Sequence, residues 1–261
     1  KMTSDFNQEL SVLWEKCTDA LFDKVVYVNR LEELLRSYGV TEESLILDVA
    51  GGFGFPVIDL AKRGYSIVFN DGSQAMFERA MFRAKEERAP GYIFQYDSFG
   101  ARPWQDFGDL SEEMWKALIC KGNSLPYAVS WGKAEPNLER AREEIKSALA
   151  NFYRILEYGG ILYVDKQPEA QEQAVEEIGE VEIDGQRMYL SCSFDNDKVR
   201  RVRNWTLTTK NQATKEKKDY PSQGYLLLEE ELVSLLNEVG FKKVEKHILE
   251  GDIYEAFVAV K

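Results

Sequence analysis

The sequence predicts an α/β protein whose core is a doubly wound, mostly parallel sheet of seven strands. Short apolar runs alternate with amphipathic helical patterns between about residues 41 and 170, as expected for a parallel sheet covered by helices on both faces. A glycine-rich turn at 48–54 joins the first strand to a helix. After residue 170 the pattern changes to strands with hairpin turns, which predicts an antiparallel insertion.

The chain divides into four expected segments. These are an N-terminal helical cap at 1–40, a core at 41–170, an antiparallel lid at 171–222, and a C-terminal helix and hairpin at 223–261 that complete the core sheet. In the lid, Asp184-Gly185 is a strong hairpin signal, whereas the polar stretch 210–218 predicts a loop.

The individual elements follow from periodicity and from stop signals. Core strands are expected at 45–49, 66–70, 92–96, 117–120 and 161–164, with helices at 55–63, 74–88 and 137–157. Ser73 is a suitable N-cap for the second of these helices, and Pro90 ends it. The end of the chain predicts a helix at 229–239, stopped by Gly240, and two strands at 241–249 and 253–260.

Composition and charge restrict the function. The 261 residues carry 45 acidic and 33 basic groups, and the formal net charge of −12 opposes binding to nucleic acid or to anionic membranes. Three separated cysteines and a single histidine, His247, favour neither a disulfide framework nor a His-rich metal site. No apolar run long enough to span a bilayer and no secretory signal is visible, so we expect a cytoplasmic protein.

The turn Asp48-Val-Ala-Gly-Gly-Phe-Gly54 is the segment that points to chemistry, because glycines let a ligand approach the backbone closely. A dinucleotide site needs a further glycine where Val57 stands, and no Gly-Lys-Ser/Thr phosphate loop is present.

Asp71 follows the second strand, 19 residues after Gly52, where an acid can accept both hydroxyls of a ribose. Asp97 follows the third strand and is a candidate for an adenine amino group. A tight turn without a ligand is the alternative.

Five motifs in order resemble the class I S-adenosylmethionine-dependent methyltransferases, more narrowly the glycine N-methyltransferase type. They are Leu47–Gly54, Val68–Ser73, Asp97–Phe99, Leu118–Ser124 and Tyr158–Asp165. The resemblance covers roughly residues 40–166, with a weaker match at 225–260. It implies a Rossmann-like methyltransferase fold and S-adenosylmethionine as cofactor, with S-adenosylhomocysteine as product and no metal.

The resemblance also implies a set of cofactor-binding residues. They are Asp48, Ala50, Gly51, Gly52, Gly54, Asn70, Asp71, Gly72, Asp97, Ser98, Phe99, Lys121, Gly122 and Asn123. Relatives often place an arginine soon after the fifth strand to hold a substrate carboxylate. Here Lys166 stands in that stretch, and as a point charge it is not equivalent to a bidentate guanidinium.

The substrate pocket is expected beyond the ends of the fourth and fifth strands. Candidate substrate-binding residues are Trp14, Phe22, Trp131, Lys166, Arg187 and Trp205, and candidate catalytic residues are Tyr127 and Tyr189. Ordinary core packing is the alternative for each aromatic residue. The arginines at 187, 200, 201 and 203 allow an anion site, although a solvated strand face is favoured for them. A structural or exposed role is favoured for His247.

Three functions remain open. The first is methyl transfer to a nitrogen of a small amine or nitrogen heterocycle, which needs no dedicated base. The second is methyl transfer to a phenolic or carboxylic oxygen, with Tyr127 or His247 as the base within hydrogen-bond reach. The third is a non-catalytic nucleotide-binding module. We expect a small-molecule partner, no nucleic acid or membrane, and a monomer or homodimer.

Overall fold

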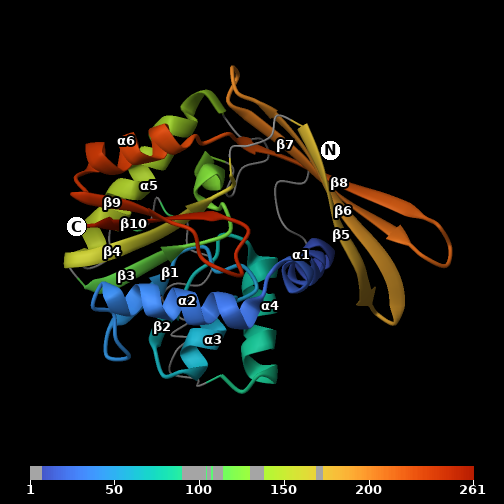
Figure 1. The fold of residues 1–261 in the computed structure, drawn as a ribbon, viewed down its shortest axis with the longest axis horizontal. Helices are drawn as coiled ribbons and strands as arrows, with labels where there is room; N and C mark the ends of the chain where they lie inside the picture. Colours follow the sequence, from blue (N-terminus) through green and yellow to red (C-terminus); the bar gives the residue numbers. More distant parts are fainter. Residues whose placement is uncertain (1–7, 90–103, 105–106, 108–113, 130–137, 169–172) are drawn as a thin grey trace.

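The computed structural model describes residues 8–89, 104, 107, 114–129, 138–168 and 173–261. It contains a mostly parallel central sheet and a separate antiparallel sheet, which confirms the predicted α/β class (Figure 1). The expected strand at 92–96 lies outside the described residues.

The central sheet has six strands within the described residues, in the order β2-β1-β3-β4-β10-β9. They are β1 (Leu45–Asp48), β2 (Ser66–Phe69), β3 (Trp115–Cys120), β4 (Leu156–Lys166), β9 (Lys243–His247) and β10 (Glu255–Val260). Strands β2, β1, β3 and β4 run parallel, whereas β10 pairs antiparallel with β4 and β9 antiparallel with β10. The chain leaves β1 toward β2 on one side and returns to β3 on the other. The carboxyl ends of β1 and β3 therefore form the switch point at which such sheets bind ligands.

Helices cover both faces of this sheet (Figure 1). On one face lie α2 (Lys24–Ser37), α3 (Val57–Lys62) and α4 (Gln74–Glu86), and on the other lie α5 (Ala141–Ile155) and α6 (Glu229–Val239). Each helix buries an apolar stripe; in α5 the stripe includes Ile145, Leu149 and Phe152. This is the doubly wound arrangement that the alternation of patterns predicts. Within the described ranges, no helix is both long and apolar enough to cross a membrane.

The second sheet is an antiparallel meander. Its strands are β5 (Gln173–Ile183), β6 (Gln186–Asp197), β7 (Val202–Asn211) and β8 (Lys217–Tyr225). Asp184 and Gly185 both have positive φ between β5 and β6, which confirms the predicted hairpin. The prediction of a loop over 210–218 is wrong at both of its ends, because β7 runs on to Asn211 and β8 begins at Lys217. As an exposed edge strand, β8 tolerates the lysines and the proline that suggest a loop.

The N-terminal helix α1 (Gln8–Leu21) packs on one face of the second sheet. Alternate residues of β6 and β7 point toward it, among them Leu190 and Leu207, and they meet Leu13 and Cys17 of the helix. All four side chains are nearly or fully buried. The sheet and α1 therefore pack as one layer. Every second residue of each strand points to the face that contacts α1, which is called the inner face below.

We predict that Leu207→Ala destabilises the protein strongly. Leu207 is fully buried between α1 and the lid, so the substitution leaves a cavity and should cost about 2–5 kcal/mol of unfolding free energy. The matched control is Thr206→Ala on the opposite face of the same strand, expected to cost about 0.5 kcal/mol or less. Urea unfolding measures both variants. Equal losses would contradict the placement of Leu207 in this interface.

Candidate cofactor and substrate pocket

The glycine-rich turn after β1 is held by hydrogen bonds to its own backbone and to the end of β2. The Ala50 amide donates to Asp48 Oδ1 at 3.1 Å, and the Gly51 amide donates to the Asn70 carbonyl at 3.0 Å. The Asn70 side chain donates back to the Val49 carbonyl at 3.2 Å. Asp48 and Asn70 are fully buried, so they shape the turn from beneath.

Asp71 joins this turn to the start of α4. Its two carboxylate oxygens accept the amides of Gly52 at 2.8 Å and of Ser73 at 2.7 Å. Burial disfavours the charged form and raises the pKa of Asp71 to about 6, although both amide contacts oppose the shift. The carboxylate is therefore ionised at neutral pH and protonated a little below it.

Two glycines of the turn are required for different reasons. A Cβ on Gly51 would lie 2.0 Å from Cε2 of the Phe69 ring, so no side chain fits there. Gly52 has a φ of +55°, and a Cβ built on it meets nothing within 4 Å. The backbone at Gly52 consequently faces open space, as a close ligand contact requires.

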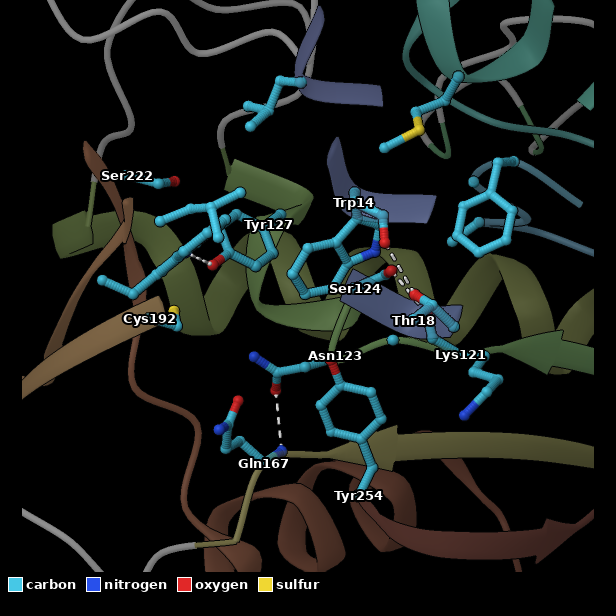
Figure 2. A pocket seen from close by; sticks show the side chains of 18 of the residues that line it. Trp14, Thr18, Lys121, Asn123, Ser124, Tyr127, Gln167, Cys192, Ser222 and Tyr254 are labelled. Carbon is cyan, nitrogen blue, oxygen red and sulfur yellow. Dashed lines mark hydrogen bonds between the residues drawn. The ribbon is translucent and has the colours of Figure 1, made fainter. Parts of the chain in front are cut away.

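A single cavity extends from this turn to the underside of the lid. On the core side it is lined by Ala50, Gly51, Gly52, Asp71, Gly72, Ser73, Met76, Lys121, Gly122, Asn123 and Gln167. On the other side it is lined by residues of α1, of the η4 turn (Leu125–Val129), of the lid and of the turn between β9 and β10. They include Trp14, Phe22 just after α1, Tyr127, Cys192, Phe194, Arg203, Trp205, Ser222 and Tyr254. Figure 2 shows Tyr127, Cys192 and Ser222 along one side of the pocket and Asn123, Gln167 and Tyr254 along another.

Tyr127 lies where the η4 turn meets the lid. Its hydroxyl accepts a 2.7 Å hydrogen bond from Trp205 Nε1, and the Trp205 ring lies 5.8 Å from that of Trp14. The ring of Tyr127 also occupies the space beside Gly224, where a Cβ would come within 2.8 Å of it. Burial raises the pKa of Tyr127, so its phenol stays protonated near neutral pH.

Lys121 follows β3 and carries a charge that is balanced within the protein. Its ammonium lies 3.0 Å from Asp252 and 3.4 Å from Asp165. The same nitrogen sits 4.2 Å from the centre of the Tyr27 ring and 4.7 Å from that of Phe22, where the negative faces of the rings attract it. Asp165 also accepts the Asn123 amide at 2.7 Å, which fixes the backbone after β3.

Arg203, on β7, reaches the cavity from the lid. The residue is 5% exposed, its Nη2 donates to Gln167 Oε1 at 2.6 Å, and its guanidinium lies 4.5 Å from the centre of the Phe194 ring. The solvated strand face favoured from sequence is therefore wrong for Arg203. It holds for Arg200, which is exposed.

The structure gathers most of the sequence-predicted site residues around the cavity. Those that line it are Trp14, Phe22, Ala50, Gly51, Gly52, Asp71, Gly72, Lys121, Gly122, Asn123, Tyr127 and Trp205. Asp48, Gly54 and Asn70 support the turn without lining the cavity. Asp97, Ser98, Phe99 and Trp131 lie outside the described residues.

Three predicted site residues lie away from the cavity. Arg187 and Tyr189 do not line the cavity because side chains alternate along β6. Leu190 and Cys192 point inward, so the odd-numbered residues of this strand point outward. The Tyr189 hydroxyl interacts with Glu177 on that outer face, which raises its pKa. Lys166 is buried, donates to the Gln167 carbonyl at 2.9 Å and lies 3.6 Å from Glu255. These positions argue against direct contact of the three residues with a substrate.

His247 lies on the edge strand β9, where its Nε2 is 3.2 Å from the Tyr38 hydroxyl, and it does not line the cavity. The expected structural or exposed role agrees with this position. Burial lowers the pKa of His247, and the negative charge of Glu245 opposes this shift.

The sequence does not indicate Gln167 or Tyr254 as site residues, and for Arg203 it favours a solvated strand face over the anion site. Arg203 was detectable, since it lies two residues from Trp205 in a strand and shares its face. Tyr254 gave no such signal, because it comes from the turn between β9 and β10, more than a hundred residues after the strand ends that it faces.

Comparison with known proteins supports the resemblance seen in the motifs. The chain is 32% identical over 132 residues to the glycine/sarcosine N-methyltransferase of Parasynechococcus marenigrum (strain WH8102), covering 51% of this chain and 40% of the relative. It is 26% identical over 223 residues to the glycine/sarcosine/dimethylglycine N-methyltransferase of Actinopolyspora halophila, covering 85% of this chain and 34% of the relative. The chain thus spans less than half the length of these curated relatives.

A solved structure extends the likeness to the whole fold. An S-adenosylmethionine-dependent methyltransferase from Clostridium acetobutylicum ATCC 824 superposes with a TM-score of 0.67 at 12% identity, covering 97% of both chains. No family model matches the chain. In fold and motifs the chain thus resembles the class I S-adenosylmethionine-dependent methyltransferases, and in sequence the glycine N-methyltransferase type.

The residues present fit S-adenosylmethionine. The turn at Gly52 offers bare backbone to a ligand, and Asp71, which the motifs suggest as a ribose ligand, lines the same cavity. Gly122 and Asn123 add the end of β3 to the wall. Three strand ends at the switch point therefore supply the binding surface, which is the usual place for an adenosyl ligand in this class of sheet.

We predict that S-adenosylhomocysteine binds less tightly in acid. Asp71, with a pKa of about 6, accepts ribose hydroxyls fully only when it is ionised, so affinity should fall about tenfold between pH 7.5 and pH 5. Isothermal titration calorimetry at each pH measures the change.

Asp71→Asn is the control for this pH profile. It should bind more weakly at pH 7.5 and lose most of the pH dependence. A profile that stays as steep in Asp71→Asn would assign the titration to Asp165, whose pKa burial also raises to about 6.

Proposed function

We propose that this protein is an S-adenosylmethionine-dependent methyltransferase that transfers a methyl group to a nitrogen of a small molecule. The observation that carries the proposal is the continuous cavity that joins the Gly52–Asp71 turn to the aromatic underside of the lid. One end suits an adenosyl ligand, and the other provides an enclosed space for an acceptor. A module that only binds a nucleotide needs no such second compartment.

When bound, S-adenosylmethionine supplies a methyl group on a positively charged sulfur, which departs neutral and needs no acid. The protein's main task is alignment of the acceptor with that methyl group, and alignment alone can lower the barrier by about 7–11 kcal/mol. Trp14, Trp205 and Tyr254 provide flat walls for this purpose. Rings so placed also attract positive charge in the cavity.

The side chains that line the cavity favour nitrogen over oxygen as acceptor. A neutral amine attacks through its lone pair, and the apolar walls disfavour its protonated form. A phenol or alcohol needs a base within hydrogen-bond reach. Of the two bases considered for oxygen, Tyr127 is held protonated by burial and His247 lies away from the cavity.

The names of the relatives support the same choice of atom. Both curated relatives are named for methylation of nitrogen in glycine derivatives. Because this chain spans less than half of their length, we extend to it the nitrogen acceptor and not the particular substrate.

Two measurements test this function. S-adenosylhomocysteine should bind with micromolar affinity by titration calorimetry, and methyl groups from labelled S-adenosylmethionine should appear on small primary or secondary amines. A panel of phenols and carboxylic acids of matched size provides the comparison. Methylated oxygen with unmodified amines would contradict the nitrogen assignment, and binding without any transfer would favour the non-catalytic module.

Tyr127→Phe should reduce kcat/KM by about tenfold, because one hydrogen bond near the acceptor is lost. The shape of the pH–rate profile should stay the same, since a protonated phenol takes no proton in the reaction. Steady-state kinetics with an active amine measure both quantities. A loss of more than a thousandfold, with a missing ionisation in the profile, would instead make Tyr127 the general base.

A further inference from the structure

Arg203 places a buried positive charge in the wall of the acceptor compartment. The residue is 5% exposed, and one terminal nitrogen of its guanidinium is bound by the Gln167 side chain. Its Nε has no hydrogen-bond partner among the described residues. No carboxylate of a described residue forms an ion pair with the guanidinium. A buried charge without a counter-charge is unfavourable, so an anion that reaches it is bound strongly.

Lys121, the other positively charged residue that lines the cavity, already has counter-charges. Lys121 lies between the carboxylates of Asp165 and Asp252 and is surrounded by aromatic rings, so its charge is already matched inside the protein. Arg203 has only a neutral amide and the Phe194 ring as described partners. Of these two cations, Arg203 is the one without a carboxylate counter-charge among the described residues, so it is the one available to an anionic ligand.

The surroundings of Arg203 hold its guanidinium in one orientation. Phe194 lies 4.5 Å from it and Gln167 binds Nη2, which leaves the buried Nε without a hydrogen-bond partner among the described residues. Gln167 is itself anchored to the core, because its backbone amide donates to Asn123 Oδ1 at 3.2 Å (Figure 2). The guanidinium is therefore presented at the junction between the lid and the end of β4.

We propose that Arg203, held by Gln167, forms an anion subsite that binds a carboxylate or phosphate group of the methyl acceptor. The inference rests on the proposed function and narrows it: the acceptor is a small amine that also carries an anionic group. A guanidinium presents paired N–H donors that match the oxygens of either anion. The lid thus supplies the arginine that the stretch after the fifth predicted strand lacks.

Glu176 is the internal carboxylate best placed to compete. It lies on β5, lines the same cavity and is exposed. Burial raises the pKa of the Cys192 thiol, and Arg203 and Glu176 act on that thiol in opposite directions, so both charges are close enough to affect Cys192. If Glu176 competes for Arg203 in solution, Glu176→Gln should bind an anion at least as well as the unmodified protein.

The test uses the full chain saturated with S-adenosylhomocysteine, titrated with acetate and with its neutral isostere acetamide at constant ionic strength. Binding is followed by tryptophan fluorescence, because Trp205 lies two residues from Arg203 on the same face. Acetate should bind saturably and at least tenfold more tightly than acetamide. Arg203→Met, which keeps much of the packing on Phe194, should remove that preference, whereas the exposed control Arg200→Met should retain it.

The possible outcomes separate the subsite from the proposed function. Equal binding of acetate and acetamide by the unmodified protein overturns the subsite without requiring any variant, and so does a folded Arg203→Met that keeps the preference. Inorganic phosphate in place of acetate distinguishes a phosphate-bearing acceptor from a carboxylate-bearing one. Failure of S-adenosylhomocysteine to bind overturns the function, while the acetate preference can still be measured in the protein alone.

Discussion

The hydrogen bond from the Gly52 amide to the Asp71 carboxylate is the interaction on which the site depends. It ties the turn after β1 to the turn after β2, and Asp71 simultaneously accepts the amide of Ser73, the residue before α4. Gly52 has a positive φ, which glycine adopts without strain, and a Cβ built on it would meet nothing within 4 Å. The same contact that stabilises the fold thereby leaves the Asp71 carboxylate in the wall of the cavity, where we propose that it binds a ribose.

The second half of the site is created by contacts between the lid and the core. Trp205 Nε1 donates to Tyr127, and Arg203 donates to Gln167, so two side chains of β7 are bound by groups that follow β3 and β4. Because β7 alternates its side chains, both contacts arise from one face of one strand. The part of the cavity that we propose for the acceptor is therefore shaped by the register of the lid as much as by the parallel sheet. Different lids on one core can select different acceptors in this manner.

The sequence was most informative where local chemistry determines local structure. The turn at Gly51 and Gly52 allows few conformations, and the alternation of strands and helices around it permits few topologies, so this half of the site was predictable. The lid was harder. The sequence predicts strands between 179 and 210 but not β8, whose start it predicts as a loop. It also places Tyr189 on the inner face, because the phase of alternation in β6 depends on which residues meet α1.

The remaining omissions have a similar physical origin. A solvated position is predicted for Arg203 because arginine is usually exposed. Its spacing of two residues from Trp205, however, places both side chains on the same face of the strand. Tyr254 and Asp252 reach Lys121 only because the C-terminal hairpin returns antiparallel beside β4. Such a contact, between residues more than a hundred positions apart, follows from topology and leaves no trace in local patterns.

The most direct measurement of the central claim is a crystal structure of the protein with S-adenosylhomocysteine. The account predicts ribose hydroxyls on the Asp71 carboxylate, the ligand against the bare backbone at Gly52, and its sulfur directed toward the compartment beneath Trp205. A complex in which the ligand lies elsewhere, with Asp71 bound only to its two backbone amides, would contradict it.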